Sequence, residues 1–340
     1  MKYLISILVG TITTGIFYFS PIFLLSPSPV SAEYWIREMI VIKRNIALTY
    51  QNKNKIFILA GSNALFNIDT RTLSNEFNLP VINYGLMGAL PLETLFKEIS
   101  EVAESGDIVI LPLEPDSYCK EKIEGYREFE IRNAIAWNFL YWKELSYIDK
   151  ILAIRFVSSK FPIEIIAARF AQAFNPESIA PRLNALNDDF ILNKFNDPQK
   201  NIEVSLYSIY NVDTLGNIKN TNDSLYSGSP RRADTEIEIC ATSLDKIIRF
   251  KDLMAVKGVK IYFANIPFVK IADLNYESIA FFDSNFKGIL SKIAPVLDSR
   301  TNLIFPLPLF LNTELHLNST GRELRTKLLI EAMYESNIIK

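Results

Sequence analysis

The sequence predicts an α/β protein in which helices cover both faces of a parallel sheet, a three-layer α/β/α sandwich. Short, continuously apolar runs alternate with stretches of helical periodicity, and this alternation resumes after a long interruption in mid-chain. Strands buried on both faces have this continuous apolar character. The chain has 340 residues, 49% of them hydrophobic, which allows a sizeable core and excludes a disordered protein.

The predicted elements follow one another in a regular order. Apolar runs indicate strands at 55–60, 81–83, 108–113, 259–267 and 302–305. Helical spacing of apolar residues indicates helices at 90–104, 235–257, 282–294 and 321–333. Residues 119–235 are rich in aromatic residues and asparagine, with helical stretches such as 132–173. We expect this part to be a helical insertion or cap rather than a separate domain.

The N-terminal region has a different composition. No charged residue occurs from Tyr3 to Leu25, and this 23-residue run is long enough to cross a bilayer as a helix. Cleavage after Ala32 is the alternative, because Val30-Ser31-Ala32 is an acceptable small-residue cleavage site. The expected parts are a transmembrane signal anchor, a juxtamembrane stalk and the α/β domain, at 1–32, 33–54 and 55–340.

A short apolar segment ahead of a long body is the usual arrangement of an exported protein. We therefore expect a single-pass protein of the cell inner membrane, with its body in the periplasm or at the cell exterior. The cleaved alternative would be secreted. Lysine and arginine number 36 against 38 acidic residues, a net charge of −2, so no nucleic-acid partner is expected.

The rare residue types restrict the chemistry. His316 is the only histidine, which excludes a site with several imidazole ligands, and we expect neither a metal nor a cofactor. The only two cysteines are Cys119 and Cys240. They form either a disulfide, which an oxidising compartment favours, or two buried thiols.

Ligands of open α/β sheets bind at the carboxyl ends of the strands, so the residues there are the candidate site. A serine becomes a nucleophile when a histidine takes its proton, and glycine lets backbone N–H groups approach a developing oxyanion. Ser62, Gly88 and His316 therefore predict an acyl-transfer site. The other polar or turn residues expected to shape this cleft are Asn63, Asn83, Gly85, Glu114 and Asp116.

Each of these residues also has an ordinary structural interpretation. Ser62 is suited to be a helix N-cap, the glycines near 85–88 are suited to a turn, and a lone histidine before a helix is often a capping residue. Their joint occurrence in this order, each at the edge of a predicted element, favours the catalytic interpretation.

Three blocks resemble the SGNH (GDSL-like) hydrolase superfamily. LAGSNALFNID resembles its first block, INYGLMGA its second and LHLNSTGRELRT its last. The resemblance implies Ser62 as nucleophile, Gly88 as oxyanion donor together with the Ser62 amide, His316 as base, and Asn83 and Gly85 as residues that shape the turn. The segments GSNALFNID, GDIVILPLE and HLNSTGRELRT resemble the corresponding sequences of membrane-anchored members linked to bacterial cell-surface polysaccharide modification.

The chain departs from the family pattern at three positions. Gly61 replaces the aspartate before the nucleophile, Glu114 replaces the asparagine that donates to the oxyanion, and Thr313 replaces the aspartate that orients the histidine. Asn312 and Glu314 flank Thr313, and neither is the expected orienting residue. We expect either a Ser–His dyad or an imidazole oriented by Glu114. A structural ion pair of Glu114 with Arg232 or Arg322 is the competing interpretation.

The resemblance implies an O-acyltransferase or esterase that acts on acyl groups, acetyl first of all, of an exported or cell-surface glycan. A membrane acyltransferase is a further candidate partner. The alternative from another class is a catalytically inactive protein of the same fold that binds glycan or scaffolds a surface-polysaccharide assembly. Three tyrosines of the insertion either stack on sugar rings or pack in the core: Tyr207, Tyr210 and Tyr226.

Overall fold

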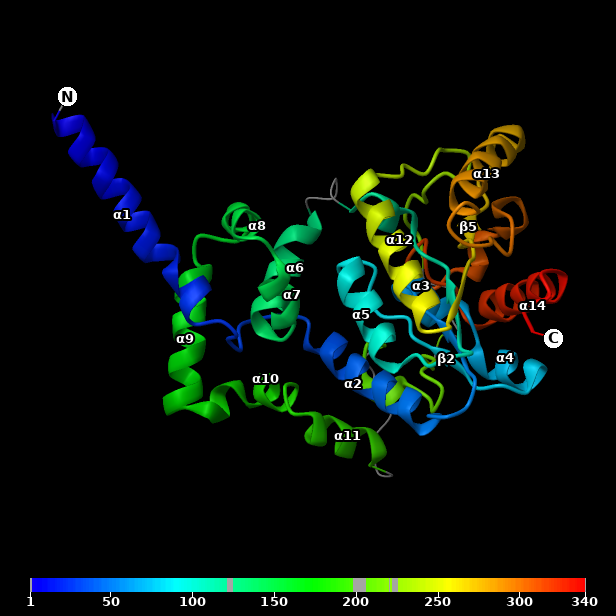
Figure 1. Cartoon of the computed structure of the whole chain (residues 1–340), viewed down its shortest axis with the longest axis horizontal. Helices are drawn as coiled ribbons and strands as arrows, with labels where there is room; N and C mark the ends of the chain where they lie inside the picture. Colours follow the sequence, from blue (N-terminus) through cyan, green and yellow to red (C-terminus); the bar gives the residue numbers. More distant parts are fainter. Residues whose placement is uncertain (1, 121–124, 198–205, 220, 222–225, 340) are drawn as a thin grey trace. The chain divides into compact units, whose positions relative to one another are not determined.

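The computed structural model describes residues 2–120, 125–197, 206–219, 221 and 226–339. The chain is a mixed α/β protein with a parallel sheet, and it divides into two compact units (Figure 1). The helical unit comprises Met1–Glu38 and Ile123–Lys194. The α/β unit comprises Met39–Lys122 and Phe195–Lys340. The insertion expected at 119–235 is thus shared: its helical part joins the N-terminal segment, and its remainder belongs to the α/β unit.

The α/β unit is built on a four-stranded parallel sheet of order β2-β1-β3-β4. Ile56 of β1 lies opposite Val81 of β2 on one side and Ile108 of β3 on the other. Every residue of these three strands is buried, as their uninterrupted apolar sequences predict. The four strands are β1 (Ile56–Ile58), β2 (Val81–Asn83), β3 (Ile108–Leu111) and β4 (Lys260–Phe263).

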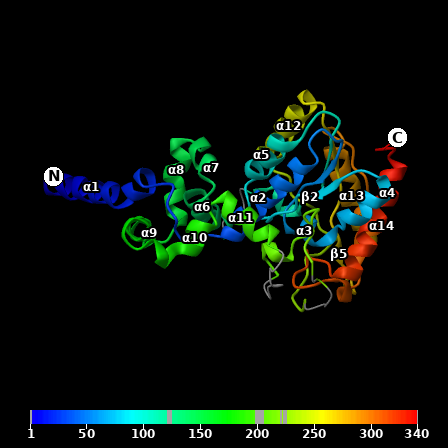
Figure 2. The same ribbon diagram turned by 90° about the horizontal axis from the view of Figure 1, so that it is seen from below.

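The helices of this unit pack in two groups. Helices α5 and α12 contact each other through the stacked rings of Phe96 and Phe250, whose centroids are 4.2 Å apart. Helix α14 contacts α3 and α4, and α4 and α14 lie side by side in Figures 1 and 2. The helices are α3 (Ser62–Asn67), α4 (Thr70–Phe77), α5 (Leu92–Val102), α12 (Ala241–Val256), α13 (Tyr276–Leu290) and α14 (Ser319–Glu335).

The last predicted strand lies outside the four-stranded sheet. It forms β6 (Ile304–Phe305), which pairs in parallel with β5 (Phe268–Val269) in a separate two-stranded sheet. Among the residues that the structure describes, the short 3₁₀ helices are η1 (Pro115–Tyr118), η3 (Ile154–Phe156), η4 (Pro176–Ile179), η5 (Ile209–Asn211), η6 (Arg300–Leu303) and η7 (Leu307–Leu309).

The expected juxtamembrane stalk is largely part of the α/β core. It forms α2 (Tyr34–Thr49), whose apolar side chains, such as Ile42 and Ile46, are buried. Lys43 on this helix is also buried, and its Nζ donates to the carbonyl oxygens of Asn83 at 2.7 Å and Gly216 at 3.0 Å. The helix is amphipathic, and burying its apolar side stabilises it more than exposure as a free stalk would.

The helical unit contains the predicted apolar N-terminal helix, and its stretch Tyr3–Leu24 is long and apolar enough to span a membrane. The C-terminal turn of that helix enters the unit's own core, where Ile22 packs with Ile135, Phe161 and Ile165. The helices are α1 (Lys2–Leu24), α6 (Gly125–Ala136), α7 (Phe139–Glu144), α8 (Tyr147–Ala153), α9 (Phe161–Phe174) and α10 (Ala180–Asn184), with α11 (Asp188–Asn196) at the unit's edge.

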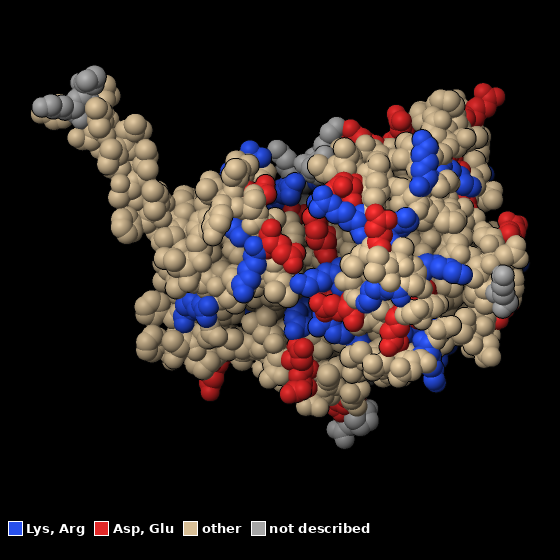
Figure 3. Space-filling model, viewed as in Figure 1, with Lys and Arg blue, Asp and Glu red and all other residues tan. Residues whose placement is uncertain are grey.

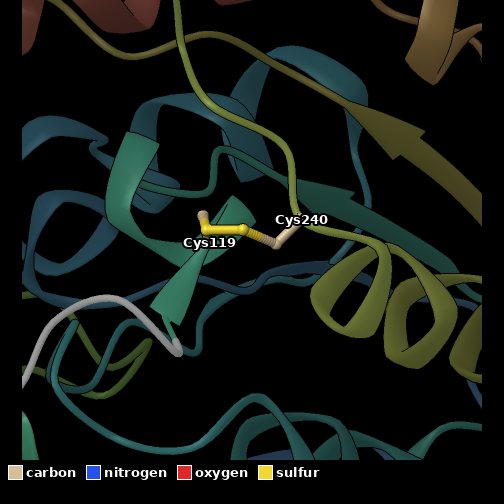
Figure 4. Close-up of a disulfide and its surroundings, with 2 residues drawn as sticks. All are labelled: Cys119 and Cys240. Carbon is tan, nitrogen blue, oxygen red and sulfur yellow. A yellow bond between two sulfur atoms is a disulfide. The ribbon is translucent and has the colours of Figure 1, made fainter.

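A disulfide joins Cys119 and Cys240 within the α/β unit (Figure 4). Cys119 follows η1 and Cys240 precedes α12, so the bond closes a loop with a sequence separation of 121. Their Cα atoms are 4.7 Å apart, and the Cys240 amide donates to the Tyr118 carbonyl oxygen at 2.9 Å. Of the two alternatives for these cysteines, the structure has the disulfide.

Candidate active site

Ser62 and His316 lie in hydrogen-bond contact although 254 positions separate them in the sequence. Ser62 is the first residue of α3, directly after the first strand, and His316 lies in the segment between η7 and α14. The distance from Ser62 Oγ to His316 Nε2 is 2.7 Å. The half-buried serine and the buried imidazole thus have the geometry of a nucleophile and its base.

Asn312 occupies the position that orients the imidazole. Its Oδ1 lies 2.8 Å from His316 Nδ1, opposite the nitrogen that faces Ser62. The backbone N–H of His316 donates to the carbonyl oxygen of Thr313, and the backbone N–H of Leu311 donates to the carbonyl oxygen of His316. These two bonds fold the segment into a tight turn. The Thr313 hydroxyl accepts from the Leu315 amide and remains within the turn.

Asn312 contacts both the histidine and Tyr207. Burial raises the pKa of the Tyr207 hydroxyl, and its hydrogen bond to Asn312 opposes that rise. The Asn312 atom that faces Nδ1 is its amide oxygen, which can only accept a hydrogen bond, so Nδ1 of His316 carries the proton.

This tautomer leaves Nε2 as the acceptor for the Ser62 hydroxyl, which is the arrangement that a general base requires. Burial lowers the pKa of His316 from 6.5 to about 3, so the imidazole is neutral at physiological pH. A neutral amide, unlike a carboxylate, adds no negative charge to counter that effect. The imidazole is therefore oriented to accept the Ser62 proton, while Asn312 contributes no charge that stabilises the imidazolium form.

Two further residues of α3, which the sequence pattern does not indicate, position the histidine. The Phe66 ring stacks on the imidazole with centroids 4.2 Å apart. Asn67 donates to the Leu315 carbonyl oxygen at 2.9 Å and accepts from the Leu317 amide at 2.7 Å, and so holds the backbone on both sides of His316. One short helix thus supplies Ser62 and part of the support of His316.

Glu114 does not orient the imidazole, contrary to one expectation, because Asn312 occupies that position. Its buried carboxylate accepts from the amides of Gly61 at 3.2 Å and Asn63 at 3.3 Å, on either side of Ser62. The competing ion pairs are also wrong. Among the described residues, Arg232 forms ion pairs with Asp234 and Asp273. Arg322 donates to the carbonyl oxygen of Ile218.

Gly61 lies where the backbone is closely approached by Glu114 and Gly88. A Cβ atom at Gly61 would lie 2.3 Å from Glu114 Oε1 and 2.4 Å from the amide nitrogen of Gly88. No side chain fits at this position. The same contact places the Gly88 backbone against the turn that begins at Ser62, where an oxyanion donor belongs.

The amides near Ser62 divide into two sets. Glu114 takes those of Gly61 and Asn63. Within the part of the chain that the structure describes, no acceptor is found for the amides of Ser62 and Gly88. These two N–H groups are the ones that the sequence predicts to form the oxyanion hole.

The predicted cleft-shaping residues have distinct positions. The Asn83 side chain donates to the Ala64 carbonyl oxygen at 2.8 Å and accepts from the Gly85 amide at 2.9 Å, which ties the second turn to α3. Asn63 donates to the Pro112 carbonyl oxygen at 2.6 Å. Both side chains are buried and act as supports of the turns rather than as a lining.

Asp116 forms an ion pair at 2.8 Å with Arg231, whose amide also bonds to the Glu314 carboxylate. This bridge links the segment after β3 to the turn that carries His316. Of the three tyrosines of the insertion, Tyr207 reaches the site, where its ring packs edge-on against Phe66.

Comparison with known proteins finds no family model and no curated protein sequence that matches this chain. The function of this chain is therefore inferred from the geometry of its site.

Proposed function

We propose that this protein is a serine-dependent O-acyltransferase or esterase of the SGNH kind that acts on acyl groups of an exported or cell-surface glycan. The observation that carries the proposal is the Ser62–His316–Asn312 chain of contacts, at 2.7 and 2.8 Å, beside two backbone amides available for an oxyanion. A carboxamide in the third position serves the same role in cysteine proteases with a Cys-His-Asn arrangement.

The reaction proceeds in two halves. Ser62 Oγ attacks the acyl carbonyl carbon while His316 Nε2 takes its proton, and the amides of Ser62 and Gly88 hold the oxyanion. The intermediate collapses to an acyl-serine, and the proton on Nε2 goes to the departing alcohol oxygen. Water or a sugar hydroxyl then attacks the acyl-serine and gives its proton to Nε2, which returns it to Ser62. Water yields the free acid, and a sugar hydroxyl yields a new ester.

Two features support the finer parts of the proposal. The pairing of α5 with α12, and of α14 with α3 and α4, supports the three-layer arrangement. Retention of the N-terminal anchor is supported because Ile22 and Val30 lie in the core of the helical unit, where a cleaved peptide would leave a cavity. A body in the periplasm or at the cell exterior, and cooperation with a membrane acyltransferase, agree with such an anchor.

One observation favours the inactive alternative. The Glu114 carboxylate lies against the backbone of Gly61 and Gly88, where negative charge opposes an oxyanion. On this alternative the site binds glycan or scaffolds a surface-polysaccharide assembly without acyl transfer.

A serine-reactive fluorophosphonate distinguishes the two candidates. The purified full chain in detergent is expected to become labelled, and Ser62→Ala is expected to abolish the label. Ser117→Ala is the matched control, because Ser117 is a buried serine after β3 that has no histidine beside it. A wild-type chain that takes up no label yet retains glycan would establish the binding alternative.

A further inference from the structure

Helix α9 has two apolar faces, and only one of them is covered. Its buried face, formed by Phe161, Ile165 and Ala168, packs in the core of the helical unit. Its other face is a stripe with the spacing i, i+3, i+4, i+7 and i+11, which places these residues on one side of a helix. The exposed members of this stripe are Ile163, Ile166, Ala167, Phe170 and Phe174.

The charged residues of α9 are used elsewhere. Glu164 pairs with Arg132 at 2.9 Å and accepts from the Ser31 amide, and Arg169 donates to the Leu25 carbonyl oxygen at 3.0 Å. The stripe therefore carries no charge of its own. Phe170 is 61% exposed and Phe174 is 79% exposed, which is costly in water.

Helix α8, which precedes α9 in the chain, also exposes apolar side chains, together with the charged residues Asp149 and Lys150. Tyr147 is 82% exposed, and Ile148, Ile151 and Leu152 are also exposed. On the face shown in Figure 3, the surface around α1 and its junction with the helical unit is largely uncharged. We call the exposed apolar residues of α8 and α9 the apolar collar.

The position of the collar relative to α1 indicates what covers it. Tyr18 of α1 donates to the Ser159 carbonyl oxygen just before α9 begins, and Phe19 and Ile22 pack beside Phe161. From Tyr3 to Tyr18 a helix rises only about 22 Å, whereas the hydrocarbon core of a bilayer is about 30 Å thick. If α1 crosses the bilayer, the start of α9 lies within the membrane or at its boundary.

We propose that the apolar collar is a lipid-contacting surface that lies in the membrane interface around the point where α1 leaves the bilayer. The occupant is the bilayer itself, because α1, which is long and apolar enough to span a membrane, packs against α9, and the exposed stripe of α9 carries no charge. Amphipathic helices that lie in the interface bury such a face at the boundary between headgroups and acyl chains. This surface is separate from the site of the proposed acyl transfer.

Introduced cysteines test the proposal in the full chain, because its two native cysteines are joined and no other thiol is present. Phe170→Cys reports on the collar, Ile12→Cys on the span, and Val256→Cys is the matched control. Val256 is an 87%-exposed apolar residue of the α/β unit. Each variant is labelled with an environment-sensitive fluorophore and reconstituted into vesicles of phosphatidylethanolamine and phosphatidylglycerol that contain doxyl-labelled lipid.

We expect blue-shifted emission and quenching by doxyl lipid at positions 12 and 170, and neither effect at position 256. The proposal would be overturned if the fluorophore at position 12 were quenched by doxyl lipid while the emission and quenching at position 170 equalled those at position 256. A blue shift at 170 that grows with protein density and is insensitive to doxyl lipid would assign the collar to a second copy of the chain, which also overturns it. Labelling of Ser62 by fluorophosphonate is a separate readout, so failure here leaves the acyl-transfer proposal untouched.

Discussion

The two units of the chain use helices of similar length in opposite ways. Helix α5 of the α/β unit buries its apolar side against the neighbouring α12, and Glu93 on its surface pairs with Lys246. Helix α9 of the helical unit buries one apolar face and exposes another. The sequence of α5 suits a boundary between core and water, whereas that of α9 suits a helix with apolar surroundings on two sides.

The same contrast holds for polar groups. In the α/β unit, buried polar side chains gather where strands end, and Ser62, Glu114 and His316 lie within that region. In the helical unit, charged groups such as Glu164 and Arg169 hold the segment after α1 in place. We infer that chemistry belongs to the α/β unit and attachment to the helical unit.

The largest effect that would sharpen this division is expected at Asn312. Asn312→Leu removes the acceptor that fixes the His316 tautomer and should lower kcat/KM for a small aryl acetate by about 10²–10⁴-fold. Asn312→Asp places a carboxylate beside Nδ1, which favours the imidazolium and raises the pKa of His316. The acid limb of the pH–rate profile should then move to higher pH than in the wild type. Equal activity of the wild type and Asn312→Leu would show that Asn312 does not position the base.

The disulfide provides a test of whether the units are independent. Cys119 and Cys240 close a loop with a sequence separation of 121. Removing such a crosslink typically lowers the free energy of unfolding by about 2–5 kcal/mol. All three tryptophans, Trp35, Trp137 and Trp142, lie in the helical unit, so their fluorescence reports on it alone. In the Cys119→Ala/Cys240→Ala variant, the urea midpoint for loss of esterase activity should fall more than the tryptophan midpoint. Equal shifts in both midpoints would show that the two units unfold as one.

Much of the α/β unit was predictable because its signals are local. Continuous apolar runs give the four parallel strands, and the order of the blocks gives Ser62 and His316, which the fold brings to 2.7 Å. Asn312 was not identified as the orienting residue, because its role depends on a tight turn that places it four residues before the histidine on the same side. No local pattern specifies that turn.

The remaining differences arise from long-range packing. Asn67 is an ordinary helical asparagine in the sequence, and its two bonds to the chain around His316 span about 250 positions. The expected stalk differs from the structure because α2 from Met39 onward belongs to the α/β unit, where Lys43 donates to the carbonyl oxygens of Asn83 and Gly216. The division of the insertion between two units likewise depends on contacts with the N-terminal segment, which residue periodicity does not reveal.

The smallest expected effect concerns Glu114 and is seen in the pH profile. Burial raises the pKa of Glu114, although the amides of Asn63 and Gly61 favour the ionised form. A carboxyl whose pKa is raised on folding stabilises the protein most at low pH, and that contribution is lost as the pH rises from its unfolded pKa through its folded pKa. Glu114→Gln removes this titration, so the variant should lose less stability than the wild type over that range.

The catalytic consequence follows from the same charge. Glu114 lies against the backbone of Gly61 and Gly88, so in the proposed reaction its ionised form would raise the energy of the tetrahedral intermediate. The wild type should therefore lose activity on the alkaline side, whereas Glu114→Gln should hold its rate there and exceed the wild type a few-fold. Asp116→Asn is the matched control, because it removes a carboxylate that pairs with Arg231 instead of with the amides beside Ser62. An alkaline limb that persists unchanged in Glu114→Gln would assign it to another group and leave Glu114 as a support of the turn alone.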